Sequence, residues 1–221
     1  RDQTALSTNV YLALTYAKGG QIGNVTVKGA LELSPNRVIS WETLGMIYRD
    51  IQSMATGSLE WGIKSFEKAI TLEPSNPVLH TELGKLYLVS GDTERAKAAF
   101  NKAKELKPDY VYASIQMALI SERENNLSEA VKQMEDLVSA YPFNAEVLFQ
   151  LGRLYFNNNQ LDEAISQFEK VISLMPNHSN THYSLGIAYQ KKGEIGKAIA
   201  EFEKVLELNP GNPDVQARLE E

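Results

Sequence analysis

Apolar residues recur along this chain at intervals of three and four, the spacing of residues that share one face of an α-helix. Between Asn177 and Asn212 the pattern predicts two amphipathic helices, with a turn at Gly193 between them and a proline after the second. A proline fits a helix end because it cannot continue the hydrogen-bond ladder. The same proline recurs every 34 residues, at Pro74, Pro108, Pro142, Pro176 and Pro210. The helix pair is therefore predicted to repeat along the chain.

Three further sets of residues keep this interval. Glycine or asparagine, which can adopt the left-handed conformation that ends a helix, stands at Gly57, Gly91, Asn125, Asn159 and Gly193. A large apolar residue stands at Phe66, Phe100, Met134, Phe168 and Phe202. Small residues, which let paired helices cross closely, stand at Gly84, Ala118, Gly152 and Gly186 and at Ala96, Ala130, Ala164 and Ala198. Self-similarity at a fixed period predicts a stacked array with one continuous core.

The period divides residues 1–221 as a single array. Its parts are an irregular first pair (1–37), an expanded repeat (38–76), four regular repeats (77–110, 111–144, 145–178 and 179–212) and a partial terminal helix (213–221). Tyr48 and Leu59 of the expanded repeat are 11 residues apart, whereas the equivalent Tyr189 and Ile195 are 6 apart. The extra residues either lengthen the first helix or enlarge the loop after it.

These residues resemble the tetratricopeptide repeat (TPR) family over nearly the whole chain, because 34 residues is that family's period and the prolines, turns and small residues keep register together. The resemblance implies an all-α fold, a right-handed α-solenoid of antiparallel helix pairs. It also implies a non-catalytic protein–protein interaction scaffold. The first helices of the family line a concave groove that holds a peptide or helix of a partner protein.

The positions that face this groove in the family can be carried over to the present sequence. They form an apolar and aromatic wall with cations beside it, which suits an amphipathic helix or an extended segment with apolar anchors and some acidic residues. The candidate partner-binding residues are Lys85, Tyr112, Ile115, Leu119, Arg123, Phe149, Arg153, Phe156, Tyr183, Ile187 and Lys191. The alternative is that several of them pack against neighbouring helices.

The expanded repeat is similar to the soluble repeat tails of some bacterial membrane proteins related to O-antigen ligases and polymerases. The similarity is carried by residues 41–49, Trp61 and residues 66–70. It implies an alternative function, a structural or self-associating tail domain of a larger bacterial membrane protein. Val215 and Leu219 are the large apolar residues after Pro213, so we expect the last pair to stay incompletely covered and to support weak homo-oligomerisation.

Composition narrows the class of protein and leaves its compartment open. A net charge of −6 and a pI of about 5.3 argue against a general binder of nucleic acid or acidic membranes. Cysteine is absent, which excludes disulfide and thiol chemistry, and we expect no direct membrane insertion because no apolar run approaches the ~20 residues of a spanning helix. The chain starts at Arg1 without a methionine, and we interpret it as a fragment or a processed chain. Cytoplasmic, periplasmic and membrane-tethered locations all fit.

Candidate chemistry is sparse. His178 and His182 are four residues apart, a spacing typical of metal ligands, but the turn at 177–180 should keep them from sharing a helical face. His80 and His182 occupy the same repeat position, which favours core or half-buried histidines. We find no phosphate-binding glycine loop and no nucleophile elbow in the sequence. We therefore expect no catalytic residue, metal or cofactor, and an enzyme active site outside this sequence remains a separate possibility.

Trp61 is the aromatic residue with two competing interpretations. It precedes Gly62 at a position where a second helix normally faces outward. We favour burial under the extra residues of 49–57, because large exposed aromatic side chains are uncommon on monomers. The alternative is an exposed aromatic side chain that docks another domain.

Overall fold

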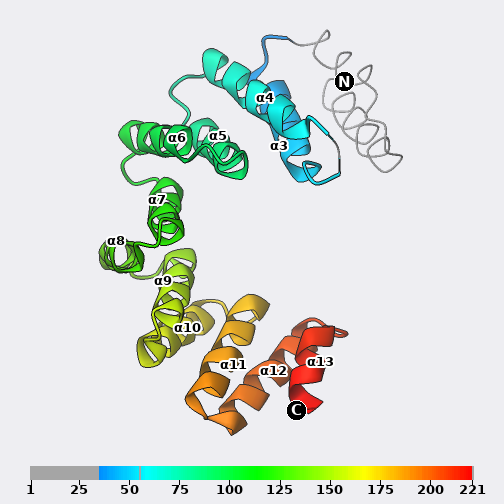
Figure 1. Cartoon of the computed structure of the whole chain (residues 1–221), viewed down its shortest axis with the longest axis vertical. Helices are drawn as coiled ribbons and strands as arrows, with labels where there is room; N and C mark the ends of the chain where they lie inside the picture. Colours follow the sequence, from blue (N-terminus) through cyan, green and yellow to red (C-terminus); the bar gives the residue numbers. More distant parts are fainter. Residues whose placement is uncertain (1–34, 55, 221) are drawn as a thin grey trace. The chain divides into compact units, whose positions relative to one another are not determined.

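The computed structural model describes residues 35–54 and 56–220, and the secondary structure within them is entirely helical (Figure 1). The predicted all-α class is confirmed. The irregular first pair lies, up to residue 34, outside the described residues. In the described part of the chain, no helix is long and apolar enough to cross a bilayer.

The chain divides into two compact units between Ser114 and Ile115, and each is described by itself. Within its described residues, the first unit contains α3 (Val38–Asp50), α4 (Ser58–Leu72), α5 (Pro77–Val89) and α6 (Thr93–Leu106). The division falls within α7 (Val111–Arg123). The second unit continues with α8 (Leu127–Ala140), α9 (Ala145–Asn157), α10 (Leu161–Leu174), α11 (Ser179–Lys192), α12 (Ile195–Leu208) and α13 (Pro213–Glu220).

The turn inside each helix pair has the left-handed backbone that the sequence predicts. The φ angles are 80° at Gly57, 81° at Gly91, 60° at Asn125, 60° at Asn159 and 83° at Gly193. In the expanded repeat, α3 ends at Asp50 and α4 begins at Ser58, so the extra residues enlarge the loop and do not prolong the helix.

The large apolar residue of each second helix is buried within its helix pair. Phe66, Phe100, Met134, Phe168 and Phe202 are all 2% exposed or less. The ring of Phe100 lies against Gly84, where an added Cβ would be 2.6 Å from Cε1 of the ring. The repeat that carries Ala118 in place of this glycine carries Met134 in place of phenylalanine. A flexible methionine can pack where the extra methyl group of alanine takes up the room of a ring.

A tyrosine–glutamate hydrogen bond joins successive repeats, and sequence reasoning missed it. The tyrosine lies near the end of a first helix, and the glutamate lies on the second helix of the preceding repeat. The donor–acceptor distances are 2.9 Å for Tyr87 and Glu67, 2.6 Å for Tyr155 and Glu135, and 2.7 Å for Tyr189 and Glu169. The repeat at 111–144 has Ser121 at the tyrosine position, and Asn101 stands at the matching glutamate position. Both partners of the bond therefore change together.

Trp61 is 46% exposed, so the interpretation that the enlarged loop buries it is wrong. The indole stacks on Tyr48 of α3, with ring centroids 6.3 Å apart, and Nζ of Lys64 lies 5.5 Å from the indole centroid. The indole therefore packs beside α3, and the loop leaves much of it in contact with solvent.

Candidate partner-binding face

The first helices of the second unit form one continuous surface. The helix α9 packs against α11, and side-chain contacts join each first helix to the next. We call this surface, made by α7, α9 and α11, the first-helix face. Its members are Leu119, Glu122, Arg123, Arg153, Phe156, Asn157, Ile187, Gln190 and Lys191.

Glu122 of α7 is the acceptor at the centre of a network that ties α7 to α9. Nη1 and Nη2 of Arg153 donate to its two oxygens at 3.0 and 2.7 Å, and Nδ2 of Asn157 donates to Oε1 at 2.7 Å. Burial alone would raise the pKa of the Glu122 carboxyl, but the bonds from Arg153 and Asn157 outweigh it and hold the pKa below the ordinary range. The bidentate geometry fixes the guanidinium of Arg153 within the face.

Further contacts extend this network toward the end of the chain. Nζ of Lys191 lies 4.9 Å from the ring centroid of Phe156, which joins α11 to α9 by a cation–π contact. Nη1 of Arg218 on α13 donates to Gln190 at 3.2 Å. The hydroxyl of Tyr183 donates to Asp214 of α13. Two of the predicted cations, Arg153 and Lys191, therefore already have partners within the unit.

Some of the predicted partner-binding residues are accessible on the surface, and others are buried. Leu119, Phe156 and Ile187 are half-buried, and Arg123 and Lys191 are exposed. Ile115 is only 2% exposed, so the prediction that it lines the surface is wrong. A side chain that is buried in the core offers almost no area to a partner.

Phe149 and Tyr183 follow the alternative interpretation, packing against neighbouring helices. The ring of Phe149 lies 5.8 Å from that of Phe168 and 5.6 Å from the imidazole of His178, measured between centroids. The ring of Tyr183 lies 6.1 Å from that of Phe202. Both rings are half-buried, and both help to join their helices to the next element.

Two predicted residues belong to the first unit. Nζ of Lys85 lies 2.7 Å from Oε1 of Glu82, and the other oxygen of Glu82 accepts from Arg49 of α3 at 2.5 Å. Tyr112 is 54% exposed, and its ring lies 5.7 Å from that of Tyr110. Lys85, like Arg153, is held by a carboxylate of its own chain.

The histidines have structural partners. His182 is 6% exposed, with Nδ1 2.6 Å from Oε2 of Glu201 and Nε2 2.8 Å from the carbonyl of Pro176. Nε2 of His80 lies 2.9 Å from the carbonyl of Pro74, the equivalent proline three repeats earlier along the chain. The prediction of core or half-buried histidines is confirmed. Within residues 35–54 and 56–220, no three His, Asp or Glu side chains are grouped as a metal site would need.

Sequence reasoning did not foresee the side-chain pairs that join one first helix to the next. Glu122 and Arg153 are 31 residues apart, Tyr183 and Asp214 are 31 apart, and Arg49 and Glu82 are 33 apart. A search for opposite charges or hydrogen-bonding partners just under one repeat apart in the sequence would have found them. Equivalent positions of successive first helices are separated by one repeat period, so residues at this spacing lie on neighbouring first helices.

Comparison with known families agrees with this geometry. The model of the cytochrome c-type biogenesis protein H TPR domain matches residues 80–182, and the tetratricopeptide repeat model matches residues 179–212. This chain is a tetratricopeptide repeat protein.

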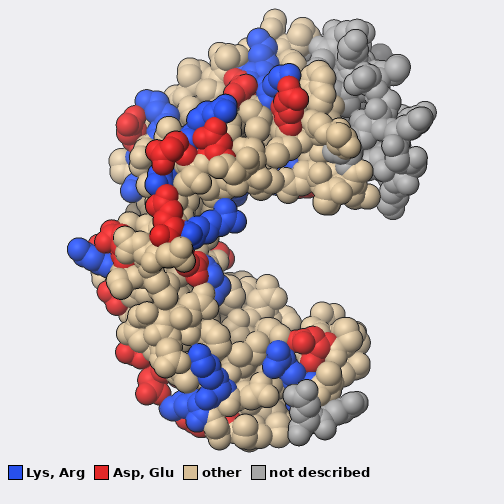
Figure 2. Space-filling model, viewed as in Figure 1, with Lys and Arg blue, Asp and Glu red and all other residues tan. Residues whose placement is uncertain are grey.

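Charged side chains of both signs are intermixed on the molecular face drawn in Figure 2, and neither sign gathers into one continuous area.

Solved TPR structures share the fold. A tetratricopeptide repeat protein from Parabacteroides merdae ATCC 43184 is 18% identical, with a TM-score of 0.72, and the match covers 97% of this chain and 83% of that one. YrrB, a TPR protein with an unusual peptide-binding site, is 22% identical, with a TM-score of 0.56, and the match covers 88% of this chain and 98% of YrrB. At these identities the likeness shows the fold alone.

The curated relatives are much longer proteins. Tetratricopeptide repeat protein 37 of Xenopus laevis is 33% identical over 96 residues, which are 43% of this TPR chain and 6% of that protein. The chain spans 18% or less of the length of the curated relatives it matches. TPR proteins are typically non-catalytic interaction scaffolds, and a scaffold role is the function that the family and the fold support for this chain.

Proposed function

We propose that the first-helix face of the second unit binds a segment of a partner protein, with Leu119, Phe156 and Ile187 as apolar contacts. The observation that carries the proposal is the set of contacts that join α7 to α9 and α9 to α11 side by side, which makes their exposed residues one surface. Half-buried apolar side chains on such a surface still have area to lose to a partner, and aromatic residues often dominate binding energy.

The bound segment has apolar anchors and some acidic residues in this proposal. Arg123 and Lys191 are exposed and lie at equivalent repeat positions on α7 and α11. Arg153 is less suited to bind an acidic residue, because such a residue would have to displace both oxygens of Glu122. Charges near the rim of an interface act mainly on the association rate and on the choice of partner.

The test is a peptide-array selection followed by titration. Peptides of about 15–20 residues, long enough for four or five helical turns, are selected on the wild-type chain, and their affinities are measured by fluorescence anisotropy. Ile187→Glu should weaken binding at least tenfold, or about 1.4 kcal/mol. Leu174→Glu is the matched control, because Leu174 is 41% exposed at the end of the second helix α10. Equal affinities of the two variants, with unchanged circular dichroism, would place the site elsewhere.

Phe149 and Arg153 are poor test positions despite their place in the predicted wall. Removing Phe149 takes a ring away from Phe168 and His178, and removing Arg153 leaves Glu122 without its main partner. Either change would alter the packing between repeats as well as the surface. The role of a tail domain in a larger bacterial membrane protein, implied by the similarity of the expanded repeat, stays an alternative proposal.

A further inference from the structure

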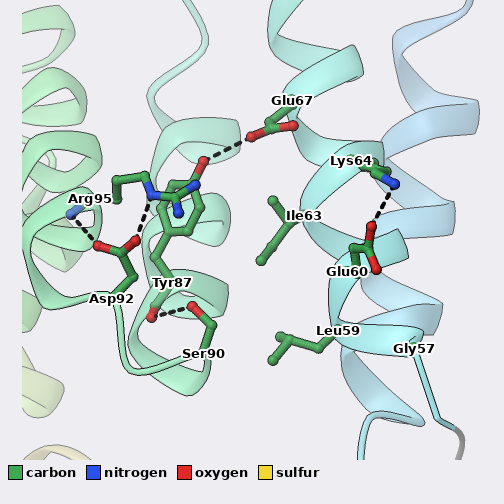
Figure 3. Close-up of a pocket in the computed structure, with 10 residues that line it drawn as sticks. All are labelled: Gly57, Leu59, Glu60, Ile63, Lys64, Glu67, Tyr87, Ser90, Asp92 and Arg95. Carbon is green, nitrogen blue, oxygen red and sulfur yellow. Dashed lines mark hydrogen bonds and ion pairs between the residues drawn. The ribbon is translucent and has the colours of Figure 1, made fainter.

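A cleft of about 600 Å³ opens in the first unit between α4 and the turn that joins α5 to α6 (Figure 3). Leu59 and Ile63 of α4 point across it toward the ring of Tyr87 on α5. The remaining lining comes from the same three helices and their turn: Gly57, Glu60, Lys64, Glu67, Ser90, Asp92 and Arg95. The cleft therefore has an apolar floor between two charged walls.

Most charges in these walls are already paired. Nζ of Lys64 lies 2.6 Å from Glu60, and Nε of Arg95 lies 2.5 Å from Asp92. Glu67 differs, because its hydrogen bond within the lining comes from the neutral hydroxyl of Tyr87 at 2.9 Å. The lining thus contains three carboxylates and two cations, and the carboxylate left without a cation is the one beside the apolar floor.

The register of the repeats explains why the cleft is open here. Leu59, Leu127, Leu161 and Ile195 stand at equivalent positions at the start of the second helices, but α6 has Thr93 at this position. One turn later, Ile63, Val131, Ile165 and Ile199 are matched by Lys97 in α6. Val131 and Ile165 are each 7% exposed, whereas Ile63 is only half-buried. The apolar seam along the second helices is interrupted at α6, and the floor residues of α4 stay accessible next to it.

We propose that this cleft is a second docking site, which takes an apolar side chain of a partner segment with a lysine or arginine beside it. The apolar side chain contacts Leu59, Ile63 and the ring of Tyr87, and the basic group pairs with Glu67. A cleft of this size suits one large side chain with its backbone. The site lies outside the first-helix face and belongs to the other unit, so it does not depend on the function proposed above.

The experiment uses acetyl-leucyl-lysinamide as the probe, with backbone amide shifts of the ¹⁵N-labelled chain as the readout. We expect saturable shifts at Leu59, Ile63 and Tyr87, with a Kd of about 1–10 mM for so small a ligand. Acetyl-alanyl-lysinamide and acetyl-leucyl-glutamamide should each bind at least threefold more weakly. Absence of saturable shifts at these residues, or equal affinity of all three probes, would overturn the proposal.

Two matched pairs of variants separate a real site from general perturbation. Ile63→Thr should weaken probe binding at least threefold, whereas Ile199→Thr, the same change at the equivalent position of α12, should leave it unchanged. Glu67→Gln keeps an acceptor for Tyr87 and removes the charge, so it should abolish the preference for lysine over glutamate in the probe. Glu135→Gln changes the equivalent bond to Tyr155 and should have no effect. Loss of binding in the control variants, or full binding and unchanged preference in Ile63→Thr and Glu67→Gln, would contradict the assignment.

Discussion

The ring of Phe202 in α12 lies so close to Gly186 of α11 that a Cβ built on the glycine would stand 2.6 Å from Cε1 of the ring. The same relationship holds for Gly152 and Phe168, with the same distance of 2.6 Å. In these two helix pairs an aromatic ring of the second helix packs directly against the backbone of the first. Because the interior is close-packed, a ring in this position has little room to move away.

Gly186→Ala should therefore destabilise the chain by roughly 1–3 kcal/mol, the usual cost of overpacking. Gly196→Ala is the matched control, since Gly196 lies in the first turn of α12 and an added Cβ meets nothing within 4 Å. The control should be neutral or stabilising by about 0.4–1 kcal/mol, because alanine loses less backbone entropy on folding. Urea denaturation of both variants measures the difference. Equal effects of the two substitutions would refute the close contact.

The repeat period predicted the parts of this fold that depend on spacing alone. The turns at Asn125 and Asn159, and the buried rings at Phe168 and Phe202, follow from a pattern that any single repeat already contains. Surface and core were harder to separate, as Ile115 shows. The burial of a first-helix residue depends on which helix packs against it in space. That neighbouring helix belongs to another repeat, so the sequence of the residue's own repeat does not predict the contact.

The Tyr155–Glu135 bond gives a second stability prediction. Tyr155→Phe should destabilise the chain by about 1 kcal/mol, the typical net contribution of a hydrogen bond. Tyr112→Phe is the control, because Tyr112 is 54% exposed and the same oxygen is removed. Thermal unfolding of both variants checks the expectation, and a Tyr155→Phe variant as stable as wild type would show that the bond contributes nothing.

The same tyrosines should make the fold sensitive to alkali. Burial and the bond to Glu135 raise the pKa of Tyr155 above its ordinary value of 10.0, and burial and the bonds to Glu67 and Glu169 act in the same direction on Tyr87 and Tyr189. A pKa raised by folding means that the stabilising contribution is complete below the unfolded value and is lost as pH rises through the folded value. Stability should therefore fall above about pH 10, and the fall should be shallower in Tyr155→Phe. Identical pH profiles for the variant and wild type would contradict this.

Ile195 and Ile199 of α12 carry the last prediction, because they are 54% and 41% exposed. At the positions equivalent to Ile199, Val131 and Ile165 are 7% exposed, and at those equivalent to Ile195, Leu127 and Leu161 are half-buried. These positions are therefore better covered in the two preceding repeats. The partial helix α13 buries Val215 completely and places Arg218 over the rings of Tyr183 and Phe202, yet it leaves these two isoleucines in contact with solvent.

Exposed apolar side chains on the surface of a repeat array favour association with another copy. We expect sedimentation velocity to detect weak, concentration-dependent association of the wild-type chain. The double substitution Ile195→Lys and Ile199→Lys should abolish it, because lysine ammonium groups would have to be desolvated in the contact. Leu174→Lys with Met175→Lys changes two exposed apolar residues at the end of α10 and should leave association intact. Association that survives in the α12 variant and disappears in the α10 variant would move the self-contact to the turn between α10 and α11.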